Sequence, residues 1–537
     1  MRTDRTIAAG LLCCTALLGP LPVVAQVEQA AGPESVVYTV RVPSPEAQIA
    51  TIEASLPTDG RSAVEVMLPI WSPGFYRIED YAGQVRSLIA RGADGEVLDV
   101  EHTRANGWRI ATAGASRVVL SYQLICDSRS VTTNWVSPEL GVLNGPATFI
   151  TLADASERPH EVRLELPPEW PGAATGLAPA PDGEPYHYRA DDYDALVDAP
   201  IVAGGLSTHE FAVDGVPHYL VDAGAPDAWD GARAARDIER IVEQTLPLWG
   251  RLPYERYVFL NVFRRGGGGL EHANSTLLTA NAERLTTEPG YRRWLSFVAH
   301  EYFHGFNVKR LRPVELGPFD YEAGPRTTSL WQAEGVTSYY AELLLARAGL
   351  NGTGDLLAAL SATIRRLQSS PGRTLETLEG SSLNVWTNSL SGVGAGDSTV
   401  SYYDKGMVVG FLLDARIRHA TGGSRSLDDV MRLAYARYSG ARGFTPDEFR
   451  ATAEEVAGID LKEWFHRVLA TTEELDYVEA LDWYGLLFAP DGSWTLEIRE
   501  DASEAQRAHL RALSAPAGQG SGAARSSTGA SALRPAA

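Results

Sequence analysis

Cysteine is scarce in this sequence, with three in 537 residues. Cys13 and Cys14 lie in an N-terminal segment that we expect to be removed from the mature protein. Cys126 then has no partner in the chain, which excludes an internal disulfide. Stability must come from a large hydrophobic core instead, and 44% of the residues are hydrophobic.

Blocks rich in lysine or arginine are also missing, and the formal net charge is −21. Nucleic acids and anionic membrane surfaces would repel this charge. We therefore expect no nucleic-acid partner for this protein.

Long hydrophobic runs are absent, and the N-terminal run at residues 7–18 is too short to cross a bilayer comfortably. Arg2 and Arg5 precede this run, and prolines and small residues follow it up to Ala25. The pattern predicts a secretory signal over residues 1–25, hence a periplasmic or secreted protein without stable membrane insertion. A retained membrane anchor is the alternative.

The pattern of the rest of the chain predicts a multidomain protein. Residues 34–205 contain short alternating runs such as VVYTVRV and RVVLSYQLI, separated by Gly, Pro and Asp clusters, which is typical of an antiparallel β-sandwich-like domain. We expect Trp71, Phe75 and Tyr76 in this domain to be core residues.

Residues 206–480 begin with strand-like runs such as YVFLNVF and continue with longer segments of helical period. This order predicts an α+β domain that ends in a helical bundle. A short segment follows at residues 481–512. Residues 513–537, which are rich in Gly, Ala and Ser, are expected to be a disordered tail.

Residues 300–304 read HEYFH. Because residues four apart lie on one face of a helix, His300 and His304 can bind one tetrahedral metal ion, with Glu301 beside the vacant position. By chance a chain of this length contains the pattern with odds on the order of one in a hundred. A third ligand elsewhere in the sequence must therefore support the interpretation.

Glu334 in SLWQAEGVTSYY is the candidate for the third ligand. It lies among apolar and small residues, where a carboxylate is costly unless it is paired or binds a metal. The alternative is a carboxylate stabilised by a helix N-terminus. Two histidines and one glutamate suit Zn²⁺ better than cobalt or manganese, so we expect one Zn²⁺ per chain.

A bound zinc ion would lower the pKa of its water to about 7, and Glu301 could take the proton as the water attacks a carbonyl. This chemistry predicts hydrolysis of a peptide or amide bond.

Two further segments suit a peptidase. In RRGGGGLEHANST, Gly268 and Gly269 would let the backbone approach a ligand closely, and Glu271 could hold a substrate ammonium group. A flexible hairpin with a surface glutamate is the alternative. In SYYDKG, the hydroxyl of Tyr402 or Tyr403 could donate to the oxyanion of the reaction, and ordinary packing is the alternative.

These segments, in this order, resemble the glycyl aminopeptidase family of zinc peptidases, which are gluzincins related to thermolysin. The resemblance extends over roughly residues 36–480. It is carried by the segments WSPGFYRIEDYA (71–82), DDYDALVDAPI (191–201), GGLEH (268–272), HEYFHGFNVKRLRP (300–313), LWQAEGVTSYY (330–340) and YYDKG (402–406).

The resemblance implies a thermolysin-like catalytic domain and a role for each matching residue. His300, His304 and Glu334 match the zinc ligands, and Glu301 matches the general base. Glu271 is similar to the glutamate that grips the free α-amino group in related aminopeptidases. Tyr403 is similar to the tyrosine that stabilises the transition state, with Tyr402 as the second choice.

The resemblance also implies peptide substrates with a free N-terminus and a preference for N-terminal Gly or Ala. Family members commonly carry a C-terminal PDZ-like domain, and we expect a shortened variant here because no carboxylate-binding loop is visible near the C-terminus.

Three functions remain open from the sequence. The first is an exported zinc aminopeptidase that releases small residues. The second is a zinc endopeptidase, if Glu271 does not face the substrate amine. The third is an inactive, metal-containing binding protein that uses its β domain for recognition. The sequence does not indicate an oligomeric state.

Overall fold

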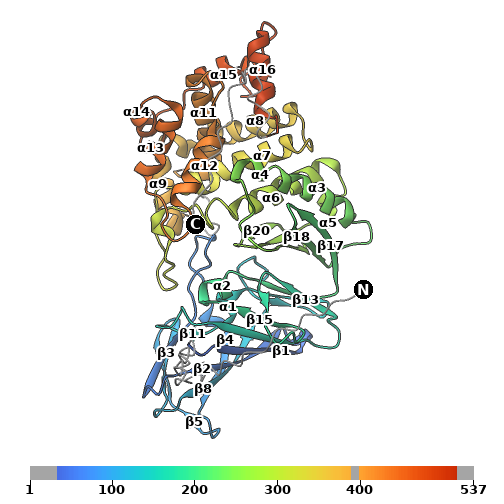
Figure 1. The fold of residues 1–537 in the computed structure, drawn as a ribbon, viewed down its shortest axis with the longest axis vertical. Helices are drawn as coiled ribbons and strands as arrows, with labels where there is room; N and C mark the ends of the chain where they lie inside the picture. The colour runs from blue at the N-terminus through green and yellow to red at the C-terminus, as the bar shows by residue number, and fades with distance from the viewer. Residues whose placement is uncertain (1–32, 389–397, 517–537) are drawn as a thin grey trace, which may run out of the picture.

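The structure is a computed structural model that describes residues 33–388 and 398–516. Figure 1 shows three layers along the long axis: β-sheets at one end, a sheet with helices in the middle, and helices at the other end. The export signal expected at residues 1–25 and most of the tail expected at 513–537 lie outside the described residues. Within the described ranges, no helix has both the length and the apolar character that a membrane span needs.

The N-terminal domain is built around an eight-stranded sheet whose strands alternate between buried and half-exposed residues, as in Val36–Ser44 and Arg117–Ile125. Two four-stranded sheets share one core cluster with it, so the domain is a sandwich. The eight-stranded sheet has the order β14 (Ala178–Pro179), β15 (His187–Ala190), β12 (His160–Glu165), β1 (Val36–Ser44), β2 (Ile49–Pro57), β8 (Arg117–Ile125), β4 (Val85–Arg91), β5 (Val97–Leu98). The smaller sheets have the orders β13 (Gly172–Thr175), β16 (Ile201–Gly204), β10 (Leu140–Leu143), β9 (Trp135–Val136) and β11 (Thr151–Leu152), β3 (Ala63–Met67), β7 (Gly107–Ala111), β6 (Val100–Arg104).

The predicted multidomain fold, with a β-rich N-terminal domain and a helical catalytic domain, is confirmed. One strand pair departs from the antiparallel expectation, because β1 pairs with β12 in parallel. The alternation of buried and exposed residues along a strand is the same for parallel and antiparallel pairing. Parallel pairing requires only that a long connection join the two strands, and β1 and β12 are far apart in the sequence. Two short helices, α1 (Gly145–Thr148) and α2 (Tyr193–Val197), lie within this region of the chain.

A five-stranded sheet forms the middle layer, in the order β17 (Leu206–Val213), β18 (Val216–Ala223), β19 (Tyr257–Phe263), β21 (Ser275–Ala280), β20 (Gly268–Glu271). The strands β18, β19 and β21 are parallel, whereas the edge strands β17 and β20 are antiparallel to their neighbours. All residues of β19 and β21 are buried.

Both faces of this middle sheet are covered. One face packs against β9, β10 and β16 of the N-terminal domain in a single apolar cluster. The helices α3 (Gly231–Glu243) and α6 (Glu288–His304) share a second core cluster with the other face. Two-sided burial explains why β19 has the almost continuously apolar sequence YVFLNVF, in which Asn261 is the one polar residue.

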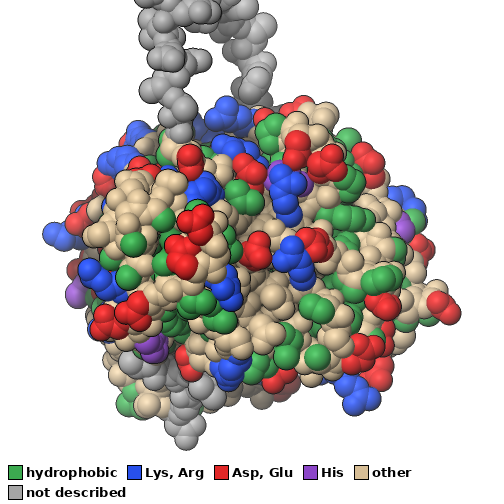
Figure 2. Space-filling model, turned by 90° about the horizontal axis from the view of Figure 1, so that it is seen from below, with side chains coloured by type: hydrophobic (Ala, Val, Ile, Leu, Met, Phe, Trp, Pro, Cys, Tyr) green, Lys and Arg blue, Asp and Glu red, His purple; other side chains and the backbone are tan. Residues whose placement is uncertain are grey.

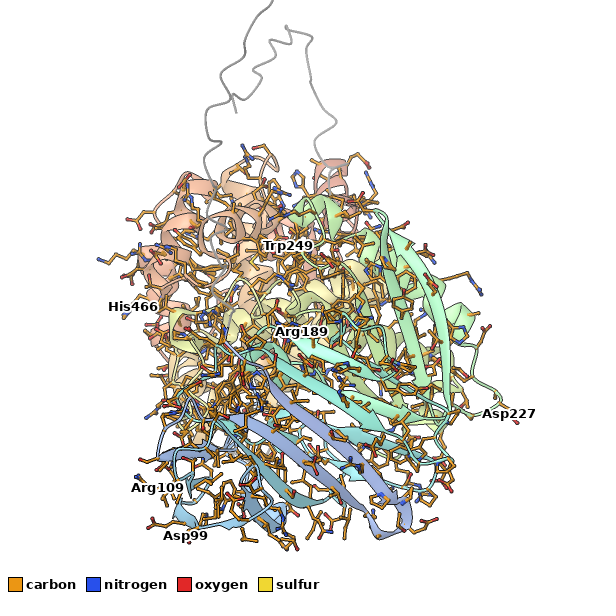
Figure 3. The ribbon with its side chains drawn as sticks, turned by 60° about the horizontal axis from the view of Figure 1, so that its bottom comes forward. Asp99, Arg109, Arg189, Asp227, Trp249 and His466 are labelled. Atoms are coloured by element: carbon orange, nitrogen blue, oxygen red, sulfur yellow. The ribbon has the colours of Figure 1, made fainter. Side chains whose placement is uncertain are left out.

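The helical layer shares its core with the middle sheet, and Trp249 of this core lies among the helices in Figure 3. The last described elements, including Leu510 and Leu513, belong to the same core cluster. The remaining helices and strands are α4 (Leu246–Trp249), α5 (Ala282–Leu285), α7 (Thr337–Arg347), α8 (Thr353–Ser369), α9 (Leu378–Leu383), α10 (Val385–Asn388), α11 (Tyr402–Ala420), α12 (Leu427–Tyr438), α13 (Pro446–Ala457), α14 (Lys462–Phe465), α15 (Val478–Tyr484), β22 (Leu486–Phe488), β23 (Leu496–Ile498) and α16 (Glu504–Leu513).

Acidic and basic side chains are interspersed on the face seen in Figure 2, which views the molecule from the end that carries the N-terminal domain. The excess of negative charge is therefore not gathered into one patch on this face.

Asp198, which caps the C-terminus of α2, fastens the N-terminal domain to two catalytic segments. Its carboxylate accepts hydrogen bonds from Lys309 Nζ at 2.5 Å, from the backbone N–H of Ala273 at 2.7 Å and from His272 Nδ1 at 3.2 Å. Burial alone would raise the pKa of Asp198, but the charge of Lys309 and the bonds from His272 and Lys309 lower it to about 2.

We predict that Asp198→Asn destabilises the folded protein by about 3–5 kcal/mol near neutral pH, because it leaves the buried charge of Lys309 without its partner. The folded-state pKa of Asp198 lies below the ordinary value of 3.8, so this stabilisation is present above about pH 4. It is lost as the pH falls toward 2.

Thermal and denaturant unfolding of both proteins at several pH values measures this difference. Asp154→Asn is the control, because it breaks an exposed pair with Arg61 and should cost less than about 1 kcal/mol. An equal loss of stability from the two substitutions at pH 7 would contradict the conclusion that Asp198 joins the N-terminal domain to the catalytic segments.

Candidate metal centre and active site

Helix α6 carries the HEYFH segment across the middle sheet. The side chain of Thr287 caps its N-terminus by accepting a hydrogen bond from the N–H of Gly290, and a proline occupies the first turn. Buried apolar residues, among them Leu295 and Val298, seat the helix in the core. The helix ends at His304, so His300 and His304 lie one turn apart at its C-terminal end.

The structure brings His300, His304 and Glu334 together, and their donor atoms all lie within 4.8 Å of one another. The two Nε2 atoms are 3.0 Å apart, and Glu334 Oε2 lies 3.4 Å from His300 Nε2 and 3.1 Å from His304 Nε2. Ligands of a tetrahedral zinc ion with bonds of 2.0–2.1 Å are about 3.3 Å apart. The spacing of the three atoms therefore fits a metal of this size.

Neighbouring groups orient both imidazole rings. His304 Nδ1 donates to the backbone carbonyl of Asn307 at 2.9 Å. His300 Nδ1 lies 3.4 Å from Ser338 Oγ, which itself donates to the carbonyl of Glu334. With a proton on each Nδ1, both Nε2 atoms present a lone pair to the same point, as in metal-binding histidines.

Glu334 lies in η4 (Trp331–Val336), a π-helix that continues into α7. A single turn of π-helix is rare and is often found at functional sites. Gly335, the next residue, touches Gly406 on α11, and a Cβ atom on either glycine would overlap the backbone of the other helix. This close crossing places the start of α11, with Tyr402 and Tyr403, beside the metal-ligand cluster.

The two tyrosines take different places at this crossing. The ring of Tyr403 lies 6.1 Å from the ring of His300 and stacks on Tyr402 at 4.8 Å. Tyr402 is 1% exposed and Tyr403 is half-buried, and both line the same cavity as the histidines.

The edge strand β20 supplies another part of the wall of the cavity that the histidines and tyrosines line. Gly269 lies so close to Glu301 that a Cβ atom would overlap the carboxylate, whereas Gly268 has ordinary van der Waals surroundings. Glu271 at the end of β20 is 3% exposed, and its Oε1 atom has no hydrogen-bond partner in the described residues.

A cavity of ≈ 240 Å³ joins all the residues predicted from the sequence for the site. Its wall contains three carboxylates, Glu271, Glu301 and Glu334, and no lysine or arginine among the described residues. Burial, with repulsion from Glu334, raises the pKa of Glu271 to about 7 against the opposing charges of His304 and Lys309. Burial alone would lower the pKa of His304, but the three carboxylates raise it to about 10. The cavity thus attracts positive charge strongly.

The N-terminal domain also contributes to this cavity, which its sequence did not indicate. Phe75 and Tyr76, expected to be ordinary core residues, line it together with Gly74, while Trp71 is buried as expected. Gly74 has a φ of +96°, which favours glycine, and its backbone lies against the carboxylate of Glu271. A long-range contact of this kind leaves no periodic signal, although a glycine between Pro73 and two aromatic residues was a local hint.

Phe297 is a further lining residue that the sequence analysis did not single out. It lies one turn before Glu301 on α6 and approaches Gly269.

Comparisons with known proteins support a common fold. A family model described as the peptidase M61 N-terminal domain matches residues 37–205, and one described as M61 glycyl aminopeptidase matches residues 293–409. A solved structure of an aminopeptidase N family protein from Idiomarina loihiensis is 30% identical, with a TM-score of 0.80, over 84% of this chain and 78% of that chain. Among curated proteins, none matches the chain.

A more distant similarity concerns the fold alone. The M1 zinc metallopeptidase from Deinococcus radiodurans, in a mutant form bound to a Tyr-Ser-Ala substrate, is 15% identical with a TM-score of 0.52. The alignment covers 82% of this chain and 94% of that chain.

The site combines a histidine pair on one helix with a glutamate from a following helix, and both face an edge strand of a mixed sheet. This is the arrangement of gluzincin-type metallopeptidases. Within this class, the chain belongs to peptidase family M61, the glycyl aminopeptidases. It is therefore an aminopeptidase-type hydrolase that acts on peptides.

We predict that Gly406→Ala destabilises the protein by about 1–3 kcal/mol, because the added methyl group forces α11 away from η4. Gly410→Ala, one turn further along α11, is the matched control. Its Cβ atom would meet Tyr339 at an ordinary 3.5 Å, so it should be neutral or stabilise by up to about 1 kcal/mol. Denaturant unfolding measures both, and equal midpoints would show that the crossing is not tightly packed.

Proposed function

We propose that the chain is a zinc aminopeptidase that removes Gly or Ala from the free N-terminus of peptides. The observation that carries this proposal is the cavity in which three carboxylates meet two oriented histidines without a lysine or arginine in the described wall. A divalent metal ion and a substrate ammonium group are the two positive charges that such a wall can hold.

His300, His304 and Glu334 would hold the metal. Two imidazole nitrogens and one carboxylate oxygen, spaced by 3.0–3.4 Å, fit a zinc ion that keeps one position open. When bound, zinc supplies a Lewis acid that lowers the pKa of water to about 7.

Glu301 follows His300 directly and lines the same cavity as the three residues that would hold the metal. Burial and the nearby charges of Glu271 and Glu334 raise its pKa well above the ordinary value. Its carboxylate therefore takes up a proton readily, which suits a base that accepts the proton of the attacking water and passes it to the leaving amine.

Glu271 and Tyr403 would act on the substrate itself. The unpartnered Oε1 of Glu271 can accept a hydrogen bond from the α-ammonium group, which fixes the first residue of the peptide. The Tyr403 hydroxyl can donate to the carbonyl oxygen as negative charge develops on it. Gly268 and Gly269 leave the edge of β20 open to the peptide backbone.

We predict that Glu301→Gln lowers kcat/KM for Ala-anilide by about 10²- to 10⁴-fold, because the water loses its proton acceptor. The zinc content should stay at that of the unmodified protein, since the three ligands are intact. Glu288→Gln, at the exposed first turn of the same helix, is the control and should keep full activity. Comparable activity of Glu301→Gln and wild type would refute the role of Glu301.

We predict that free-amine Gly- and Ala-anilides are hydrolysed and that their N-acetylated forms are not. Glu271→Gln should lower kcat/KM for the free-amine substrates by about 10- to 100-fold, because a charge-assisted hydrogen bond is lost. Initial rates of hydrolysis of the free-amine and the N-acetylated anilides, by wild type and by Glu271→Gln, measure these differences. Equal hydrolysis of the acetylated peptides would instead favour an endopeptidase, and no hydrolysis by zinc-loaded protein would favour an inactive binding protein.

A further inference from the structure

Three arginines lie near the start of the edge strand β20. Arg264 and Arg265 follow β19 directly, in the connection that leads into β20. Arg129 comes from the N-terminal domain, in the segment between β8 and β9. Its guanidinium carbon lies 4.9 Å from the centre of the Trp135 ring, which holds the side chain against the domain.

Contacts between the two domains place Arg129 close to the other two arginines. Val131, two residues after Arg129, lies 3.4 Å from the position that a Cβ atom on Gly268 would take. Val131 also shares an apolar cluster with Leu270 of β20. Burial, with repulsion from the charge of Arg129, lowers the pKa of the Arg264 guanidinium group. The two domains therefore hold like charges near each other at the start of β20.

These positive charges are not neutralised within the described part of the chain. Neither Arg129, Arg264 nor Arg265 forms an ion pair with a carboxylate there. Arg264 Nη1 donates to the backbone carbonyl of Arg265 at 3.2 Å, and its buried Nε atom has no hydrogen-bond partner. Arginine stays protonated in proteins, so the three groups repel each other until an anion binds among them.

The order of groups along β20 gives the direction of a bound peptide. Glu271, at the end of the strand, would hold the substrate amine. Gly269 lies against Glu301, which would act on the first peptide bond, and Gly268 begins the strand. A peptide added to this free sheet edge therefore starts at Glu271, passes Glu301 and continues beyond Gly268. The arginines lie in that direction, on the side of the peptide that leaves.

The distance along the chain is short. A strand advances about 3.3 Å per residue, so the four steps from Gly269 to Arg265 span at most about 13 Å. The second to fourth residues of an extended substrate can cover this length. A carboxylate on one of them, whether the C-terminus or an acidic side chain, matches the planar fork of a guanidinium group.

We propose that Arg129, Arg264 and Arg265 form a carboxylate-binding subsite for the part of the peptide that leaves. This inference rests on the proposed aminopeptidase function of the site. The substrate is then held at two points of opposite charge, its amine by the carboxylates of the cavity and its carboxylate by the arginines. The N-terminal domain takes part in substrate recognition through Arg129.

Removing the exposed charges tests the inference. The double variant Arg129→Gln with Arg265→Gln leaves the partly buried Arg264 in place, so the fold should tolerate it. Arg236→Gln is the matched control, because Arg236 is likewise exposed and has no ion pair with a carboxylate in the described residues. It lies on α3, which packs against β17 at the opposite edge of the sheet from β20.

The measurement is the release of alanine by zinc-loaded protein from two pairs of peptides. Ala-Ala-Ala and its C-terminal amide report on the C-terminus, and Ala-Ala-Asp-Ala-amide and Ala-Ala-Asn-Ala-amide report on an acidic side chain. In wild type, kcat/KM for the charged member of at least one pair should be higher by about threefold to tenfold.

This preference should fall by about threefold or more in the double variant and stay unchanged in Arg236→Gln. The pair that shows it identifies the source of the carboxylate. Ratios near one for both pairs in wild type would overturn the inference, and so would ratios that are the same in wild type and the double variant.

A binding measurement separates this inference from the function on which it rests. Zinc-loaded Glu301→Gln should bind the preferred charged peptide more tightly than its neutral counterpart by calorimetry, and the two added substitutions should narrow the gap. If wild type cleaves no peptide yet this pattern holds, the proposed function fails and the arginine subsite stands. If wild type cleaves charged and neutral peptides equally well, the function stands and the inference fails.

Discussion

The constraint on which the site depends is the burial of three carboxylates in one cavity. Taking a carboxylate out of water is costly unless opposite charge or hydrogen bonds replace the lost solvation. Glu271, Glu301 and Glu334 come from a strand, a helix and a π-helix, and the described wall offers them no lysine or arginine. The folded protein thus holds negative charge that the cavity wall does not compensate, and a metal ion and a substrate amine are suited to neutralise it.

Bringing these carboxylates together requires unusually close backbone contacts, and glycine occupies each of them. Gly74 lies against Glu271, Gly269 against Glu301, and Gly335 against Gly406. In each pair, a side chain on the glycine would push a functional residue or its helix out of place. Gly269 therefore also has a role inside the protein, in addition to the approach to a ligand that the sequence suggested.

The residues singled out from the sequence lie together around one cavity in the structure, and their selection had physical reasons. His300 and His304 follow from the helical period, and Glu334 stands out because a carboxylate among apolar residues needs a partner. The two-layer β-rich domain followed by a helical domain also follows from the change in hydrophobic period. The parallel pairing of β1 with β12 and the π-helix at Glu334 could not be predicted, because neither depends on local pattern. Tyr76 belongs to the core as expected, but it also lines the cavity, because an aromatic residue has the same sequence signature in a core as in a cavity wall.

The N-terminal domain covers one face of the middle sheet, and this has a consequence for how the protein is made. Synthesis starts at the N-terminus, and domains generally fold as units in that order. The strands β9, β10 and β16 therefore precede β18, β19 and β21 along the chain. The first domain, once folded, offers an apolar face on which the middle sheet can assemble, and in the folded protein it keeps the apolar side of β18, β19 and β21 from contact with other chains.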